Sequence, residues 1–118
     1  RDLRQRGMLD DTLVIFTSEF GRTPFTQSAA TELGKGRDHN QGGFSVWLAG
    51  AGLKHGLAYG ATDEVGWKAV DQIVTWPDFH ATVLQLLGID HERLTFYHNG
   101  IERRLTNVHG HIIEPLLA

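Results

Sequence analysis

The chain has 118 residues, 41% of them hydrophobic and 21% charged, and 14 glycines, which suits one small globular domain and excludes a disordered or fibrous protein. Its 11 basic and 14 acidic side chains give a net charge of -3, which excludes a global attraction for nucleic acid or an anionic membrane. There is no cysteine, so disulfides and thiolate zinc sites are excluded, and no apolar stretch approaches the roughly 20 residues that span a bilayer.

The first residues are typical of the end of a helix. The range 1–7 carries basic side chains on both sides of Leu3 and ends in Gly7. Both cations and glycine favour helix C-termini. We therefore expect the chain to be a piece of a longer protein. The run Leu13 to Phe16 is continuously apolar, which predicts a strand buried on both faces of a parallel sheet.

A long polar loop is predicted from Phe25 to Gly43, and loops of this length inside a compact domain are usually functional. The range 44–50 predicts a second buried strand. The ranges 57–60 and 69–74 are candidates for the two short strands of a hairpin.

The C-terminal third contains clearer local signals. Pro77 opens a helix that Gly88 closes, with apolar residues on one face between them. The pair Asn99-Gly100 lies between two short runs and predicts a β-hairpin. The apolar range 111–118 predicts a short helix or turn.

Chemistry-bearing residues follow the first predicted strand. In an open parallel sheet, ligands lie outside the carboxyl ends of the strands, which is where Glu19 and Arg22 are expected. Glu19 is a candidate metal ligand or general base, and the alternative is a surface or capping carboxylate. In the next loop, His39 is a candidate metal ligand whose tautomer Asp38 can fix, and the alternative is a solvated histidine.

Two arginines accompany these candidates. The guanidinium groups of Arg22 and Arg37 match two oxygens of a phosphate or sulfate at once, although ion pairs with Glu19 or Asp38 explain them equally well. His109 and His111 are spaced so that they can chelate a metal from an extended segment.

Several motifs together resemble a known family. In order along the chain, the ranges 17–24, 36–40, 46–52, 59–64 and 78–88 resemble the C-terminal part of a sulfatase-like family of mostly exported bacterial proteins, placed in the alkaline phosphatase and sulfatase superfamily. The resemblance covers nearly the whole chain, including 91–95 and 104–110. It implies an α/β fold in which residues 1–118 are the C-terminal segment of one domain, a three-layer α/β/α sandwich with a mainly parallel sheet.

The resemblance also implies roles for individual residues. Glu19 stands at the acidic metal-binding position after a strand, and Phe20 stands at the position of a second ligand. His39 matches a histidine of the other metal site. The nucleophile and the remaining ligands of the family belong to an earlier part of the domain.

These roles predict part of a metal-dependent hydrolase of phosphate or sulfate esters, inactive as this piece alone. Zinc, manganese or calcium would be the metal, Arg22 and Arg37 would bind the anionic ester, and the parent protein would be periplasmic or exported. The alternative is a non-catalytic binder of a glycan or a protein, and a third interpretation is a free-standing small binding domain. Tryptophan side chains would then offer contact surface, and an exposed sheet edge would support a homo-oligomer. The three tryptophans are Trp47, Trp67 and Trp76.

Overall fold

The computed structural model describes residues 1–26, 28 and 31–118, and the chain divides into two compact units. Unit 1 comprises Arg1–Val14, Ala49–Leu57 and Val74–Ala118, and unit 2 comprises Ile15–Leu48 and Ala58–Ile73.

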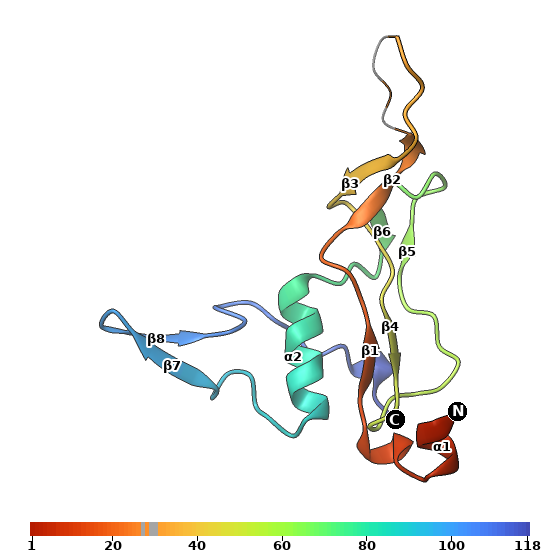
Figure 1. Ribbon diagram of the computed structural model, residues 1–118. Coiled ribbons are helices and arrows are strands. Elements are labelled where there is room, and N and C mark those ends of the chain that lie inside the picture. The colour runs from red at the N-terminus through yellow and green to blue at the C-terminus, as the bar shows by residue number, and fades with distance from the viewer. Residues whose placement is uncertain (27, 29–30) are drawn as a thin grey trace. The chain divides into compact units, whose positions relative to one another are not determined.

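Short elements dominate both units (Figure 1). The strands among the described residues form four two-stranded sheets, which pair β1 with β4, β2 with β3, β5 with β6 and β7 with β8. In chain order the described elements are α1 (Asp2–Gln5), the 3-10 helix η1 (Leu9–Asp11), β1 (Val14–Phe16), β2 (Gly21–Thr26), β3 (Arg37–Asn40), β4 (Trp47–Ala49), β5 (Ala61–Thr62), β6 (Ala69–Asp71), α2 (Trp76–Leu86), β7 (Thr95–His98), β8 (Ile101–Arg104) and the 3-10 helix η2 (Glu114–Leu116).

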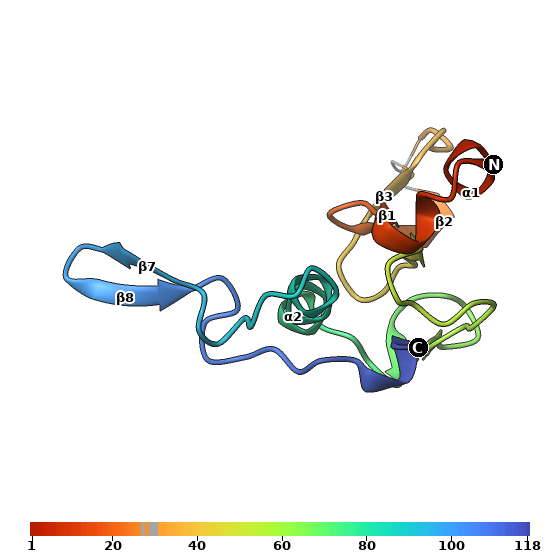
Figure 2. The ribbon, with the colours of Figure 1, turned by 90° about the horizontal axis from the view of Figure 1, so that it is seen from below.

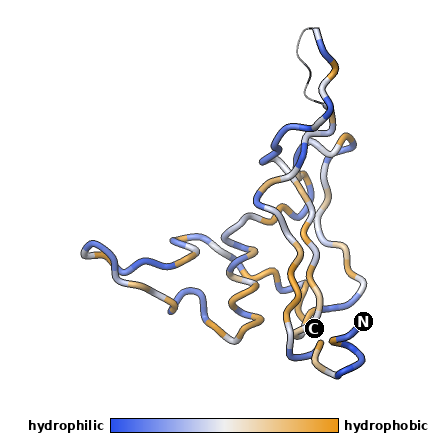
Figure 3. Tube along the Cα trace, viewed as in Figure 1, coloured by the Kyte–Doolittle hydropathy of each residue, from blue (hydrophilic) through white to orange (hydrophobic). Residues whose placement is uncertain are grey.

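The prediction of an α/β/α sandwich with a mainly parallel sheet is wrong. Within the described ranges every sheet is an antiparallel pair, including β1 and β4, whose chain directions are opposed in Figure 1. A parallel sheet needs helices over both faces, and α2 is the one described helix with more than four residues. The apolar runs that contain β1 and β4, coloured orange in Figure 3, do form strands. Phe16 is 74% exposed, however, so β1 is not buried on both faces.

Unit 1 contains the apolar core. Thr75 starts α2 with a capping box in which its hydroxyl accepts from the backbone of Asp78 and the Asp78 carboxylate accepts from the backbone of Thr75. Gly88 follows the helix with a φ of 74°, so the helix predicted after Pro77 is confirmed. The buried apolar side chains of the described residues all lie in this unit and are Leu53, Phe79, Ala81, Leu84 and Ile113.

The C-terminal segment packs on α2. Ile113 donates its backbone N–H to the hydroxyl of Thr82 at 2.9 Å, and Thr82 donates to the carbonyl of Asp78 at 2.8 Å. A Cβ on Gly110 would lie 3.0 Å from the carbonyl oxygen of Pro77. The short helix predicted in 111–118 is confirmed as η2.

The hairpin predicted around Asn99-Gly100 is also confirmed. Both turn residues have positive φ, 52° and 78°, as a two-residue type I′ turn requires. β7 and β8 pair without a bulge, from Thr95 opposite Arg104 to His98 opposite Ile101. Figure 2, which shows α2 end-on, shows the hairpin extending away from the helix.

Unit 2 is held by polar contacts. No large apolar side chain is buried among its described residues, whereas the polar side chains of Thr23 and Asn40 are. The Asn40 amide donates to the carbonyl of Trp67 at 2.8 Å and its oxygen accepts from Gly42 N–H at 2.9 Å. A hairpin is present near the range predicted for one, but its first strand is β5 at Ala61–Thr62 rather than 57–60.

The prediction of a continuous loop over 25–43 is wrong in part. Phe25 and Thr26 belong to β2, and the range 37–40 forms β3, which pairs with β2. Gln27, Ala29 and Ala30 of the predicted loop lie outside the described residues. In the described portion of the chain, no helix is long and apolar enough to cross a membrane.

Candidate functional site

The β2–β3 hairpin of unit 2 brings the two predicted groups of site residues together. Its register places Arg22 directly opposite His39, and residues directly opposite in an antiparallel pair point to the same face. The ring of Phe20 stacks on the imidazole of His39, with centroids 3.7 Å apart and planes 21° apart. The Arg22 guanidinium carbon lies 5.3 Å from the Phe20 centroid. We call Phe20, Arg22 and His39 the hairpin cluster.

Backbone contacts fix the position of the hairpin cluster. Arg22 donates from Nη1 to the carbonyl of Arg37 at 3.0 Å, which holds its guanidinium over β3. The buried hydroxyl of Thr23 accepts from the N–H of Asp38 at 3.1 Å. A Cβ on Gly21 would lie 2.5 Å from the Gly43 carbonyl oxygen, so only glycine fits where β2 begins.

The hairpin cluster is rich in N–H donors. Arg22 and His39 are both solvent-exposed, and only one of the five guanidinium N–H groups is used by the Arg37 carbonyl. A guanidinium can donate to two oxygens of an anion at once, and an imidazole on the same face of the hairpin offers a further N–H donor. The arrangement is therefore chemically suited to bind a phosphate or a sulfate group.

The other predicted site residues have different surroundings. The Asp38 carboxylate accepts from the backbone N–H of His39 at 2.7 Å, which is a backbone contact and not one to the imidazole. Glu19 is exposed, and its Oε2 accepts from the Ser18 hydroxyl at 3.3 Å.

A metal centre does not form from the described residues alone. They include no group of three or more histidine, cysteine, aspartate or glutamate side chains that could hold an ion. A catalytic zinc usually has three protein ligands, and Glu19 and His39 supply two at most. These two ligand assignments stay predictions.

Sequence reasoning missed a second polar cluster, at the start of α2 in unit 1. The carboxylate of Asp78 accepts from the backbone and hydroxyl of Thr75 and from the backbone N–H of His111 at 2.8 Å. His111 Nδ1 lies 3.3 Å from Asp78 Oδ1. Burial raises the pKa of Asp78, but the hydrogen bonds from Thr75 and His111 outweigh it and lower this pKa from 3.8 to about 2.

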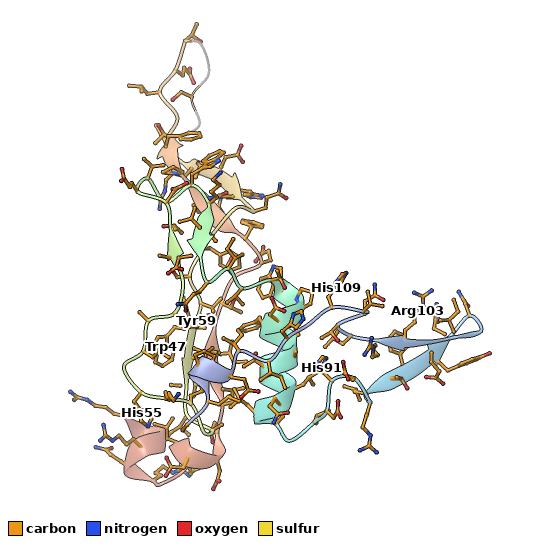
Figure 4. The ribbon with its side chains drawn as sticks, turned by 180° about the vertical axis from the view of Figure 1, so that it is seen from behind. Trp47, His55, Tyr59, His91, Arg103 and His109 are labelled. Carbon is orange, nitrogen blue, oxygen red and sulfur yellow. The ribbon has the colours of Figure 1, made fainter. Side chains whose placement is uncertain are left out.

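The sequence signal for this cluster was incomplete. A threonine three residues before an acidic residue at the start of an apolar run is a capping-box pattern, so Thr75 and Asp78 could have been paired. The partner His111 is 33 residues away, and no local pattern indicates it. His111 is part of the predicted chelating pair with His109, which lies beside α2 in Figure 4.

A buried polar pair in unit 1 joins His91 and Thr106. His91 Nδ1 is 3.0 Å from the hydroxyl of Thr106, and both residues are buried. Figure 4 shows His91 near the C-terminal half of α2. Because both side chains are partnered and inaccessible, this pair stabilises the packing of unit 1 rather than binding a ligand.

Unit 2 also exposes an aromatic pair. The rings of Phe25 and Trp67 stack with centroids 5.3 Å apart and planes 19° apart, and they line a shallow apolar pocket with Pro24 and Val65. Trp67 is 43% exposed, and Trp47, also predicted as contact surface, is 56% exposed.

A family model described as "Protein of unknown function (DUF1501)" matches residues 1–117. No curated protein and no solved structure matches the chain.

Proposed function

Since the chain belongs to the DUF1501 family, whose description names no activity, we propose from its geometry that the β2–β3 hairpin binds the anionic group of a phosphate or sulfate ester, as part of a hydrolase of such esters. The observation that carries the proposal is the placement of Arg22 directly opposite His39. The resemblance to sulfatase-like proteins supports the choice of these esters.

Each residue of the hairpin cluster has its own role in binding the anion. The Arg22 guanidinium, held by the Arg37 carbonyl, offers its remaining N–H groups to two oxygens of the anion. The imidazole of His39, held by its stack on Phe20, adds a further donor from the same face. Donors that are already in place lower the cost of neutralising charge that builds up when an ester bond breaks.

The proposed binding of the anion requires no metal ion. The described residues do not supply a complete set of ligands, so no step of the proposed chemistry involves an ion. Glu19 and His39 remain candidates for two ligands of a site that other residues would complete, with zinc, manganese or calcium as the ion.

Titration of inorganic phosphate and inorganic sulfate into the chain, followed by the NMR shifts of Arg22 and His39, tests the proposal. We expect saturable shifts that Arg22→Ala abolishes and Arg22→Lys weakens, because an ammonium group cannot bind two oxygens in one plane. Arg103→Ala is the matched control, since Arg103 is exposed on β8 in unit 1. Equal losses in Arg22→Ala and Arg103→Ala would show binding by net charge alone.

A second candidate function is the non-catalytic binding of a glycan. The exposed Phe25–Trp67 pair favours it, because the apolar face of a sugar ring packs on exposed aromatic rings. Binding of neutral oligosaccharides that is lost in Trp67→Ala and kept in Arg22→Ala would support this candidate and count against the first.

A further inference from the structure

The β7–β8 hairpin presents two free sheet edges. Every residue of β7 is exposed, and in β8 only Arg104 is partly buried. Among the described strands, none pairs with the outer edge of either β7 or β8. An isolated two-stranded hairpin is at best marginally stable in water, so a further strand along one edge would stabilise it.

The two edges differ in charge. Proteins normally protect an exposed edge strand with charged side chains, prolines or bulges. β8 carries three charges, on Glu102, Arg103 and Arg104, whereas the range 95–98 of β7 contains no aspartate, glutamate, lysine, arginine or proline. β7 also pairs with β8 without a bulge. The unprotected edge is therefore that of β7.

The register decides which pairings each edge allows. The two-residue turn makes His98 and Ile101 a hydrogen-bonded pair, so the backbone N–H and C=O groups of Thr95 and Tyr97 point away from β8. A second strand must pair through these outward groups. When two copies of β7 pair antiparallel with Tyr97 opposite Thr95, Phe96 lies opposite Phe96 of the second copy.

The outward backbone groups of β8 make the pairing of two β8 strands unfavourable. These groups belong to Glu102 and Arg104, so each antiparallel pairing of two β8 copies places Glu102, Arg103 or Arg104 opposite its own copy at the two-fold axis. In the Arg103 register, the two flanking Glu102–Arg104 pairs offset only part of this repulsion. Like charges directly opposite each other destabilise a sheet, whereas an aromatic pair stabilises it.

We propose that β7 pairs with β7 of a second copy of this chain, around a two-fold axis at Phe96. The product is a continuous antiparallel sheet of four strands, with β7 of each copy at the centre and the charged β8 strands outside. Opposed residues at such a position approach to about 4.5 Å between Cα atoms, which brings the two Phe96 rings into contact. Because the edge is only four residues long, we expect a weak dimer whose population depends on protein concentration.

The variant Phe96→Glu distinguishes an effect on dimerisation from an effect on the stability of the β7–β8 hairpin itself. Within one chain Phe96 lies opposite Arg103, so a glutamate there gains an opposite charge inside the hairpin. Across the proposed two-fold axis, however, the two glutamates face each other. Ile101→Glu is the matched control, because Ile101 lies on β8 and has almost the same exposure, 54% against 56% for Phe96.

Sedimentation velocity of the full 118-residue chain over a range of concentrations measures the effect. We expect Phe96→Glu to weaken dimerisation at least tenfold and Ile101→Glu to leave it unchanged. A wild-type chain that stays monomeric, or equal effects of the two variants, would overturn the proposal. If Phe96→Glu fails to fold, NMR on a mixture of labelled and unlabelled wild-type chains decides, since the proposal requires intermolecular contacts between Phe96 rings.

Discussion

The hydroxyl of Thr82 joins the C-terminal segment to α2, and replacing it measures how much its hydrogen bonds stabilise unit 1. Thr82 is 1% exposed, and its hydroxyl both accepts the N–H of Ile113 and donates to the carbonyl of Asp78. Thr82→Val keeps the shape of the side chain but removes both hydrogen bonds. The N–H of Ile113, a residue that is 8% exposed, then has no partner in the protein and little access to water.

The expected cost follows from that unpaired N–H. Leaving a buried donor without a partner costs about 1–3 kcal/mol, so we expect Thr82→Val to lower the free energy of unfolding by about 2 kcal/mol. In a domain of this size that corresponds to a fall in melting temperature of about 8 °C. The control Thr82→Ser keeps the hydroxyl and loses one methyl group, which costs about 1 kcal/mol.

Urea unfolding followed by far-ultraviolet circular dichroism measures both variants, because α2 dominates the helical signal. We expect the valine variant to be less stable than the serine variant. A valine variant as stable as the serine variant, or more stable, would refute this expectation, because the apolar replacement would then outweigh the two hydrogen bonds.

Two further predictions concern one residue in each unit. In the folded state the pKa of Asp78 is about 2, below its ordinary value of 3.8. The ionised carboxylate therefore stabilises unit 1 above pH 3.8, and this stabilisation is lost as the pH falls to 2. The shift in pKa corresponds to on the order of 2 kcal/mol. Asp78→Asn should flatten the acid side of the stability profile measured by urea unfolding, and a profile as steep as that of the wild type would contradict this. In unit 2, Gly21→Ala should disrupt the β2–β3 hairpin, because its Cβ would lie 2.5 Å from the Gly43 carbonyl, whereas Gly36→Ala meets nothing within 4 Å. Amide hydrogen exchange of β3 should become at least tenfold faster in the first variant and unchanged in the second, and equal rates in both would argue against this packing.

Elements with local signals could be predicted from the sequence. α2 has proline near its start and glycine after its end, and the Asn99-Gly100 turn needs only its own two residues to set the hairpin. In both cases the residues that determine the element lie within it or beside it. No distant contact is required to recognise either one.

The sheet arrangement could not be predicted in this way. The apolar run of β1 was interpreted as a strand buried on both faces, but burial depends on what packs against a strand, and β1 pairs only with β4 in the described residues. β3 was expected to be loop because its sequence is polar. It becomes a strand through the contacts of Thr23 and Asn40, which a local pattern does not contain.

Two residues of the hairpin cluster, Arg22 and His39, were singled out from the sequence, but their arrangement was not predicted. Arg22 and His39 were expected to meet at the carboxyl ends of parallel strands, and they lie instead opposite each other within an antiparallel hairpin. The role of Phe20 could not be derived, because its stack on His39 depends on the register of β2 and β3.

The confinement of the buried apolar side chains to unit 1 has a thermal consequence. The heat capacity of unfolding comes mainly from apolar surface that becomes exposed to water, and polar groups contribute with the opposite sign. Unit 1 therefore has a curved dependence of stability on temperature, with weakening on cooling as well as on heating. The described part of unit 2 buries no large apolar side chain fully, so we expect its heat capacity of unfolding to be smaller and its stability to depend less steeply on temperature.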